Sequence, residues 1–294
     1  MKYGKRILAL LLGAVLLFCL TGCGLKDLAV ARSALKLLKV QSVHAEPEAV
    51  IDVDTSGDSS DRLNLGAGGS VDLRFDRLRF QADLKLTMMG ATMASVMAVG
   101  GDVDGQFTVW YSMDRGETWT EKALCETSAI SEKLKGAGSF DLSSLKDAGS
   151  IPISSFTAMG AEEVNGSSAK RYDATFDWAK AVVDSGAEES LYEGILSAMG
   201  NSQLTVEQLR GMLDLNAQKP IQLSLWIGED GGMPVKGEAD LTETVQTLAD
   251  SDLVRGMIAS SAGEDAPAEV SINRISLAVT LSDFDSVAEI ELPE

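Results

Sequence analysis

The fold is decided by a stretch of alternating apolar and polar residues, VDLRFDRLRFQADLKLTMMG at residues 71–90. Val71, Leu73 and Phe75 are separated by charged residues, and the alternation resumes from Phe80 onward. Successive side chains of a strand point to opposite faces, so this pattern is typical of antiparallel strands with one face in water. The same alternation returns at residues 107–113, 172–176 and 221–227. The sequence therefore predicts a mostly antiparallel sheet.

Short turn sequences separate the predicted strands, and a change of phase bends the last of them. The turns are Asp104-Gly105, Asp114-Arg115-Gly116, Asn165-Gly166 and Asp230-Gly231-Gly232, whose residues tolerate positive φ. Val270 and Ile272 share one parity, whereas Ile275 and the apolar residues after it share the other. An extra residue near Asn273-Arg274, which forms a β-bulge, would restore the pleat and bend the strand. Such a bend favours a sheet that wraps around other elements.

Helical spacing marks the elements that the sheet would enclose. Apolar residues recur with a helical period from Leu25 to Leu38, which predicts a helix over about residues 26–39. Further helices are predicted at Phe176 to Ser185, Glu188 to Met199, Thr205 to Leu213, where Thr205 and Gln208 form a capping box, and Thr242 to Ile258. Residues 136–149 are rich in Ser and Gly and indicate a loop. The predicted fold class is α+β, a curved, mostly antiparallel half-barrel sheet wrapping around several helices in a single domain of residues 23–294.

The first 23 residues have the layout of a bacterial export signal. Three basic residues precede an apolar run at residues 7–20, which is shorter than the roughly 20 residues that a membrane-spanning helix needs. Leu20-Thr21-Gly22-Cys23 resembles a lipobox, in which the Cys is acylated with chains such as palmitate. The alternative is an ordinary cleaved signal with a chance Cys. We expect residues 1–22 to be a signal peptide and Cys23 to be lipidated and to anchor the protein on the extracytoplasmic face of the cell membrane.

The charge balance limits the partners. The 294 residues carry 25 Lys+Arg and 44 Asp+Glu, a formal net charge of −19, and removal of residues 1–22 leaves 22 basic against 44 acidic residues, or −22. So acidic a chain lacks the basic stripe that neutralises phosphates, so nucleic acid is not an expected partner. Anionic lipids would not attract it either. Membrane attachment therefore has to come from the acyl chains.

Few residues are available for metal or nucleophile chemistry. The chain has one His and three Cys, and Cys19 and Cys23 belong to the signal region. Cys125 has no partner for an intramolecular disulfide, and is either a small buried apolar residue or a free reactive thiol. The acidic segment that begins at Asp52 lacks the Glu that ends a calcium loop, and we interpret His44 as a strand-entry residue. No metal site, no cofactor and no catalytic residue is predicted, and the protein is predicted not to be an enzyme.

Simple alternation fails between Leu84 and Val99, where apolar residues, several of them Met, occupy both parities around a turn at Gly90. Both faces of this hairpin then have to be covered. Methionine side chains repack around variable apolar shapes, so one face could line an apolar-ligand cavity, and core packing is the alternative. The candidate cavity residues are Leu84, Leu86, Met88, Met93, Met97, Val109, Tyr111, Leu223 and Leu225. Trp110 and Trp226 fall on the opposite face, where we expect other elements or a partner to cover them.

The layout resembles the LolA/LppX-like bacterial lipoproteins. The resemblance is carried by the helix that ends in Val40-Gln41-Ser42-Val43-His44, the hairpin from Val103 to Trp119, the segment Glu163-Val164-Asn165-Gly166, the strand Leu223-Ser224-Leu225-Trp226-Ile227, the segment Met233-Pro234-Val235-Lys236 and the end Ile290-Glu291-Leu292-Pro293-Glu294. It implies a half-barrel that encloses helices and an apolar cavity, binds acyl chains or lipidated molecules, and uses no cofactor. It supplies no individual site residues.

These observations leave two functions open. The first is a membrane-anchored extracytoplasmic lipoprotein that binds an acyl chain or other apolar ligand in a cavity between sheet and helices. The alternative is a non-enzymatic structural or surface-interaction lipoprotein with a filled core, which presents an acidic outer face to an envelope protein. In either case we expect a monomer that is held at the membrane by its N-terminal lipid.

Overall fold

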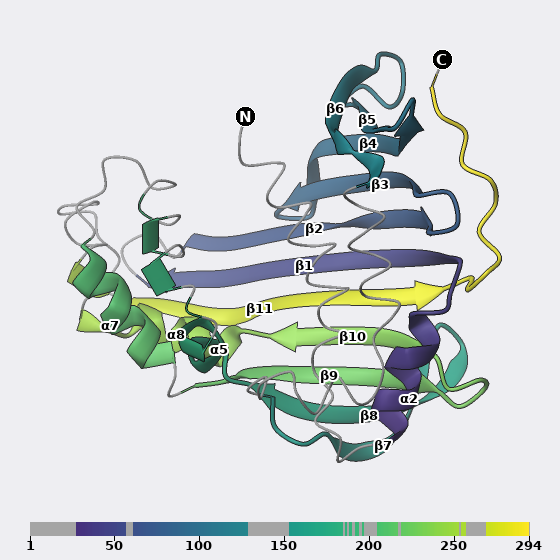
Figure 1. The fold of residues 1–294 in the computed structure, drawn as a ribbon. Coiled ribbons are helices and arrows are strands. Elements are labelled where there is room, and N and C mark those ends of the chain that lie inside the picture. The colour runs from purple at the N-terminus through teal and green to yellow at the C-terminus, as the bar shows by residue number, and fades with distance from the viewer. Residues whose placement is uncertain are drawn as a thin grey trace.

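In a computed structural model, the chain forms one antiparallel sheet of eleven strands, in the order β6-β5-β4-β3-β2-β1-β11-β10-β9-β8-β7 (Figure 1). The structure describes residues 28–56, 61–128, 153–184, 205–216, 219–252, 254–256 and 269–293, and six single positions between 186 and 196. Figure 1 shows that the sheet curves, with β4–β6 turned away from the plane of β1 and β2. The predicted α+β half-barrel is confirmed.

The strands are longer than the helices and account for most of the described chain. They are β1 Ser42–Ser56, β2 Asp61–Arg74, β3 Arg79–Met88, β4 Ala91–Val103, β5 Gln106–Ser112, β6 Thr120–Glu126, β7 Thr157–Val164, β8 Ser167–Phe176, β9 Ile221–Gly228, β10 Pro234–Asp240 and β11 Glu269–Ser282. The helices are α2 Leu28–Leu37, α5 Trp178–Asp184, α7 Val206–Asn216 and α8 Thr242–Ala249.

The register of the strand pairs gives the sheet one apolar and one polar face. In an antiparallel ladder, directly paired residues lie on the same face. Ala45 of β1 pairs with Val71 of β2 and with Leu281 of β11, and all three are buried. We call their side of the sheet the apolar face. The preceding residue of β1, His44, lies on the other side with its partner Asp72, whose carboxylate is 2.6 Å from the His44 Nδ1 atom. We call that side the polar face.

The helices pack against the apolar face at two ends of the sheet. Figure 1 shows α2 over one end of β8–β10, and α5, α7 and α8 together at the other end. Val30 of α2 packs against Tyr172 and Ile227. At the other end the side chain of Gln246 in α8 donates a hydrogen bond to the Val270 carbonyl (3.2 Å) and accepts one from the Ile272 N–H (2.6 Å). Helix α2 therefore covers one end of the apolar face, whereas α8 binds the part of β11 that β10 leaves unpaired at the other end.

The predicted bulge in β11 is confirmed. Asp52 pairs with Arg274, whereas the next residue, Val53, pairs with Ile272, so Asn273 is the extra residue. Its side-chain amide donates a hydrogen bond of 2.8 Å to Asp54. The bulge returns both Ile272 and Ile275 to the apolar face, as the change of phase in the sequence requires.

The helices agree with the sequence in position, although α2, α5 and α8 are shorter than predicted and α7 runs past the predicted end at Leu213, to Asn216. The capping box is formed: the Thr205 N–H donates to Gln208 Oε1 (2.8 Å), and the Gln208 N–H donates to Thr205 Oγ1 (3.2 Å). The helix predicted up to Ile258 ends at Ala249, because Ser251 begins a new turn and accepts a hydrogen bond from the Val254 N–H (3.2 Å). The predicted loop 136–149, and most of the helix predicted at Glu188 to Met199, lie outside the described residues.

The predicted turn at Asp114-Arg115-Gly116 is also formed, with φ of 62° at Arg115 and 90° at Gly116. Asp114 accepts hydrogen bonds from Ser112 Oγ (2.6 Å), from the Thr118 N–H (2.9 Å) and from the Thr118 hydroxyl. These bonds stabilise the charged carboxylate and lower the pKa of Asp114 to about 2.

The C-terminal segment after β11 lies along the turn between β2 and β3. Arg74 donates a hydrogen bond to the Val287 carbonyl (3.1 Å), and Arg79 donates one to the Ile290 carbonyl (2.6 Å). Ile290 is buried, and Leu292 lies against Gly101 of β4. This contact fixes the chain end to the strands that precede it by more than 200 residues.

Gly100 of β4 gives a test of this packing. A Cβ atom at this position would lie 2.1 Å from the ring of Phe80, which pairs with Gly100 and stacks on Phe107. We expect Gly100→Ala to lower the free energy of unfolding by about 1–3 kcal/mol, because the ring has to shift in a packed core. Urea denaturation followed by circular dichroism measures the loss. Gly160→Ala, in strand β7 with no atom within 4 Å of the new Cβ, is the control and should change stability little. Equal losses in both variants would contradict the packing described.

Candidate functional site

Seven of the nine predicted cavity residues lie on the apolar face. Leu84, Leu86 and Met88 of β3 share the parity of Ala82, which pairs with Val71. The remaining members of this group are Val109 and Tyr111 of β5, and Leu223 and Leu225 of β9, which pair with apolar-face residues of β4 and β10. The three strands share this face, but β9 is five strand positions away from β3 in the sheet, so the seven side chains do not form one cluster.

The seven residues differ in how much of each side chain is covered. Val109 and Leu223 are buried in the core, and Leu84, Tyr111 and Leu225 are half-buried. Leu86 and Met88 remain 45% and 37% exposed. The apolar face is therefore filled around β5 and β9 but open at the end of β3.

Met97 and Met93 do not belong to this group, which corrects their inclusion in the predicted cavity. Met97 pairs with Asp83 and so lies on the polar face, where its sulfur approaches Gly116. Met93 is the extra residue at a register shift between β3 and β4, and its side chain is 58% exposed. In a hairpin with apolar residues on both parities, the sequence does not show which parity faces inward.

Sequence reasoning missed three further exposed residues on the apolar face. Ile51 of β1, Leu63 of β2 and Leu277 of β11 are 39%, 43% and 38% exposed. Each of the three lies an even number of residues from the apolar-face residue of its own strand, which is Ala45 in β1, Val71 in β2 and Leu281 in β11, so each points to the apolar face. The alternation of Ala49, Ile51 and Val53 could have indicated a strand with one apolar face. Asp52 and Asp54, on the other parity, instead drew attention to a possible calcium loop.

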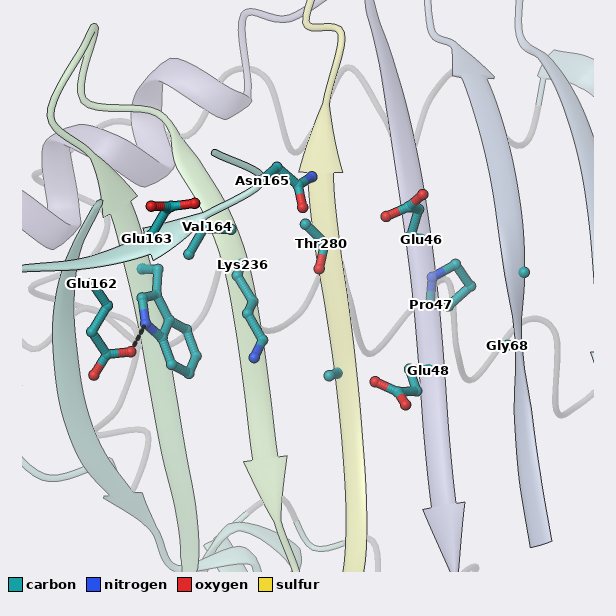
Figure 2. Close-up of a pocket in the computed structure, with 13 residues that line it drawn as sticks. Glu46, Pro47, Glu48, Gly68, Glu162, Glu163, Val164, Asn165, Lys236 and Thr280 are labelled. Carbon is teal, nitrogen blue, oxygen red and sulfur yellow. Dashed lines mark hydrogen bonds between the residues drawn. The ribbon is translucent and has the colours of Figure 1, made fainter. Parts of the chain in front are cut away.

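A hollow of about 480 Å³ lies on the polar face (Figure 2). Glu46 and Glu48 of β1 form one wall, and the segment from Glu162 to Asn165, at the end of β7, forms the opposite wall. Figure 2 shows Glu163, Val164 and Asn165 crossing in front of the neighbouring strands, while Lys236 and Thr280 stand on the strands between the walls. The hollow is thus lined by polar and charged groups, unlike the apolar cavity that was predicted.

Trp226 is the buried side chain of this region. It lies on the polar face, as predicted, and is covered by other elements of the same chain. Its indole N–H donates a hydrogen bond of 2.7 Å to Glu162, and the cationic groups of Lys236 and Arg171 lie 4.4 and 5.3 Å from the ring centroid. A hydrogen bond to Asp173 (2.7 Å) raises the pKa of Arg171. Trp226 therefore organises the charges beside the hollow, and with 5% of its surface exposed it presents no free ring face.

The remaining candidates bear on anchoring and on reactive groups. Cys23 lies outside the described residues. Cys125 is exposed on strand β6 as a free thiol, so its interpretation as a buried apolar residue is wrong. Within the described ranges, no group of three or more His, Cys, Asp or Glu side chains is placed to hold a metal ion. None of the helices in the described part of the chain combines the length and hydropathy of a membrane span.

Trp226→Phe tests the organising role of the indole. The substitution keeps an aromatic ring but removes the hydrogen bond to Glu162 and weakens the cation contacts, so we expect the free energy of unfolding to fall by about 1–2 kcal/mol. Urea denaturation followed by circular dichroism is the measurement. Trp178→Phe, which changes a half-buried indole in α5, is the control and should cost less. A loss for Trp226→Phe no larger than that of the control would contradict this role.

Comparison with known proteins gives matches in fold only. No family model and no curated protein matches the chain. The lipoprotein LppX of Mycobacterium tuberculosis is similar over 90% of this chain and 96% of its own, at 15% identity and a TM-score of 0.40. A β-barrel-like protein of a domain of unknown function from Brucella abortus (10% identity, 83% and 97% coverage, TM-score 0.25) and a LolA-superfamily protein from Nitrosomonas europaea (10%, 86% and 88%, 0.14) are also similar. The predicted resemblance to LolA/LppX-like lipoproteins is confirmed as a resemblance in fold, and at these TM-scores it carries nothing about ligand or activity.

Proposed function

We propose that this chain is a lipid-anchored extracytoplasmic protein that binds an acyl chain, or a ligand of similar shape, on the apolar face of its sheet. The function is binding, without a cofactor and without catalysis. Residues 23–294 would form one half-barrel domain that is attached to the membrane through Cys23. One observation supports the binding part above all: large apolar side chains on the apolar face remain exposed.

The exposed side chains lie on four adjacent strands. Ile51 is diagonal to both Leu63 and Leu277, and Leu86 lies two apolar-face positions further along the sheet than Leu63. The strands β3, β2, β1 and β11 lie side by side, and they carry Leu86, Leu63, Ile51 and Leu277, respectively, each at least 38% exposed. Single exposed apolar residues are ordinary on protein surfaces, but a contiguous group on one face is typical of a surface that binds an apolar partner. Burying the exposed part of one such side chain is worth about 1 kcal/mol.

The sizes of the side chains favour a narrow, elongated ligand. In one row across the four strands, Leu86 pairs with Ala67, Ala67 with Ala49, and Ala49 with Leu277. Two small residues thus lie between two leucines, over a width of about three strand spacings, or about 14 Å. An alkyl chain resting on the two alanines would contact both leucines, whereas a planar or branched ligand would fit this strip less well.

The anchor would hold the domain close to the membrane. Leu28, the first residue of α2, follows Cys23 by only five positions, which is too short for a long flexible tether. Helix α2 is fixed to the sheet by Val30 and by Lys36, whose ammonium donates a hydrogen bond to the Gly231 carbonyl. A ligand bound on the apolar face would therefore stay near the bilayer from which an acyl chain comes.

Removing exposed leucines tests the binding face. We expect Leu86→Ser and Leu277→Ser each to weaken the affinity for a fluorescent fatty acid by about fivefold, which corresponds to the loss of about 1 kcal/mol of apolar contact. Leu124→Ser is the matched control, because Leu124 is 44% exposed on the edge strand β6, three strands away from β3 in the sheet. Organic extraction of the purified protein checks for bound lipid independently. Equal affinity of all variants, or no probe binding and no extracted lipid, would contradict the proposal.

Filling the strip of small residues distinguishes specific binding from general adhesion. Ala67→Leu adds apolar surface but places a large side chain between Leu86 and Ala49. If the alkyl chain rests on the alanines, affinity for the fatty-acid probe should fall by about tenfold or more, because the added side chain occupies the ligand's place. Fluorescence titration measures this. An increase in affinity would mean that the probe adheres to any exposed apolar surface.

A further inference from the structure

We infer that the C-terminal segment, residues 287–293, occupies a peptide-docking surface on the polar face, and that an extended segment of a partner protein with apolar residues at alternate positions takes its place there. This surface lies on the side of the sheet opposite to the proposed acyl-chain face and does not depend on it. The inference comes from how the segment is held, from the space left for its side chains, and from the point at which its firm attachment ends.

The segment crosses the polar face of four adjacent strands. Ser42 of β1 pairs with Arg74 of β2, and Arg74 pairs with Arg79 of β3. Gly101 of β4 is next in line, since a Cβ atom there would lie 3.2 Å from the Arg79 side chain. Figure 1 shows the segment leaving the end of β11 and running toward β4. We call these four residues, together with Arg77 in the turn between β2 and β3, the docking surface.

The docking surface recognises the main chain of the segment. Arg74 donates a hydrogen bond to the Val287 carbonyl (3.1 Å), and Arg79 donates one to the Ile290 carbonyl (2.6 Å). Among the described residues, Arg79 forms no other hydrogen bond and no ion pair, so its guanidinium serves this contact alone. Any extended peptide offers such carbonyl groups, so these bonds set the direction and register of a peptide without requiring one particular sequence.

Two side chains at alternate positions supply the specificity. Ile290 is buried, with 3% of its surface exposed, and Leu292 lies against Gly101. A Cβ atom on Gly101 would be 2.9 Å from a methyl carbon of Leu292, so the missing side chain makes the space for this leucine. Glu289 and Glu291 are exposed, and Glu289 forms an ion pair with Arg77. The pattern recognised is therefore an acidic residue followed by two apolar residues with one residue between them.

The firm attachment of the segment ends at Val287. The Asp285 N–H donates a hydrogen bond to the Ser42 carbonyl (2.8 Å), the Asp285 carboxylate accepts one from the Gln41 N–H (2.6 Å), and the Val287 N–H donates one to Ser42 Oγ (3.2 Å). Within the described part of the chain, no main-chain N–H from Ala288 to Leu292 donates a hydrogen bond. A segment with so few bonds opens locally while the sheet stays folded. The docking surface then becomes accessible to a partner that offers the same contacts.

The test is a fluorescence-anisotropy titration with a labelled peptide that has the sequence of residues 286–294, SVAEIELPE. It is titrated with the full-length wild-type chain and with the full-length variant Ile290→Ser/Leu292→Ser. In the wild-type chain the attached segment competes at an effective concentration that is roughly millimolar for a short linker. We therefore expect saturable 1:1 binding to the variant, and binding to the wild-type chain that is weaker by about tenfold or more.

The matched control is the same peptide carrying Ile290→Ser. It should bind more weakly by about tenfold or more, because a buried apolar side chain is lost. Attraction by net charge is distinguishable, because the peptide contains three glutamates and the chain has a net charge of −19. Added salt screens this repulsion and should not weaken the binding. If the double variant does not unfold cooperatively in urea, titration of the wild-type chain with the two peptides decides instead.

The outcomes separate the occupants and the two proposals. If the peptide binds neither chain, or binds as well as its Ile290→Ser form, the inference is wrong and the segment is only a part of the folded domain. A complex of wild-type chain with variant in size-exclusion chromatography, without binding of the free peptide, would overturn the assignment to a partner and indicate exchange between copies. Leu86→Ser should leave the peptide affinity unchanged, so failure of the acyl-chain proposal would not affect this result.

Discussion

A wide sheet with one apolar face has to keep that face from water, and most of this molecule is arranged by that requirement. Eleven strands give more apolar surface than the four short helices of the described residues can cover. Helix α2 covers one end, and α5, α7 and α8 cover the other (Figure 1). The part between them retains exposed leucine, isoleucine and methionine side chains. The candidate binding face is therefore the portion of the sheet that the described helices leave accessible.

The bulge at Asn273 shows how the same requirement sets the register. Because the side-chain period of a strand is two, β11 would place Val270 and Ile272 on the polar face without an extra residue. One additional residue restores both to the apolar face, at the end where α8 is bound through Gln246. The bulge and the attachment of helix α8 therefore lie at the same end of β11, where the strand also bends.

The polar face is organised by paired charges. Trp226 is buried there because Lys236 and Arg171 cover its ring and Glu162 accepts its N–H. Exposed ion pairs of this kind are worth little individually, but together they hold the end of β7 over the sheet and shape the hollow. Glu46 and Glu48 of β1, which form none of these pairs with Trp226, Lys236 or Arg171, are among the residues that line that hollow.

Local patterns in the sequence predicted much of this fold. The alternation of apolar and polar residues predicted the strands and the two faces of the sheet. The change of phase after Ile272 predicted the bulge in β11. The capping box of Thr205 and Gln208 predicted the start of α7. Features that depend on distant parts of the chain were not predictable. The face of Met97 depends on its pairing with Asp83, and the hollow depends on β1 and β7 approaching from separate parts of the chain. The segment after Leu281 likewise gave no sign that Arg74 and Arg79 would hold it.

Photocrosslinking maps the ligand on the sheet and tests the central proposal most directly. A fatty acid with a photoreactive group on its alkyl chain would be bound to the purified protein, irradiated, and located by mass spectrometry of the peptides. If the apolar face is the binding site, the label should be found on β1, β2, β3 and β11, at or beside Ala49, Ala67, Leu86 and Leu277. Label confined to residues of the polar face, or spread evenly over the surface, would contradict the proposal.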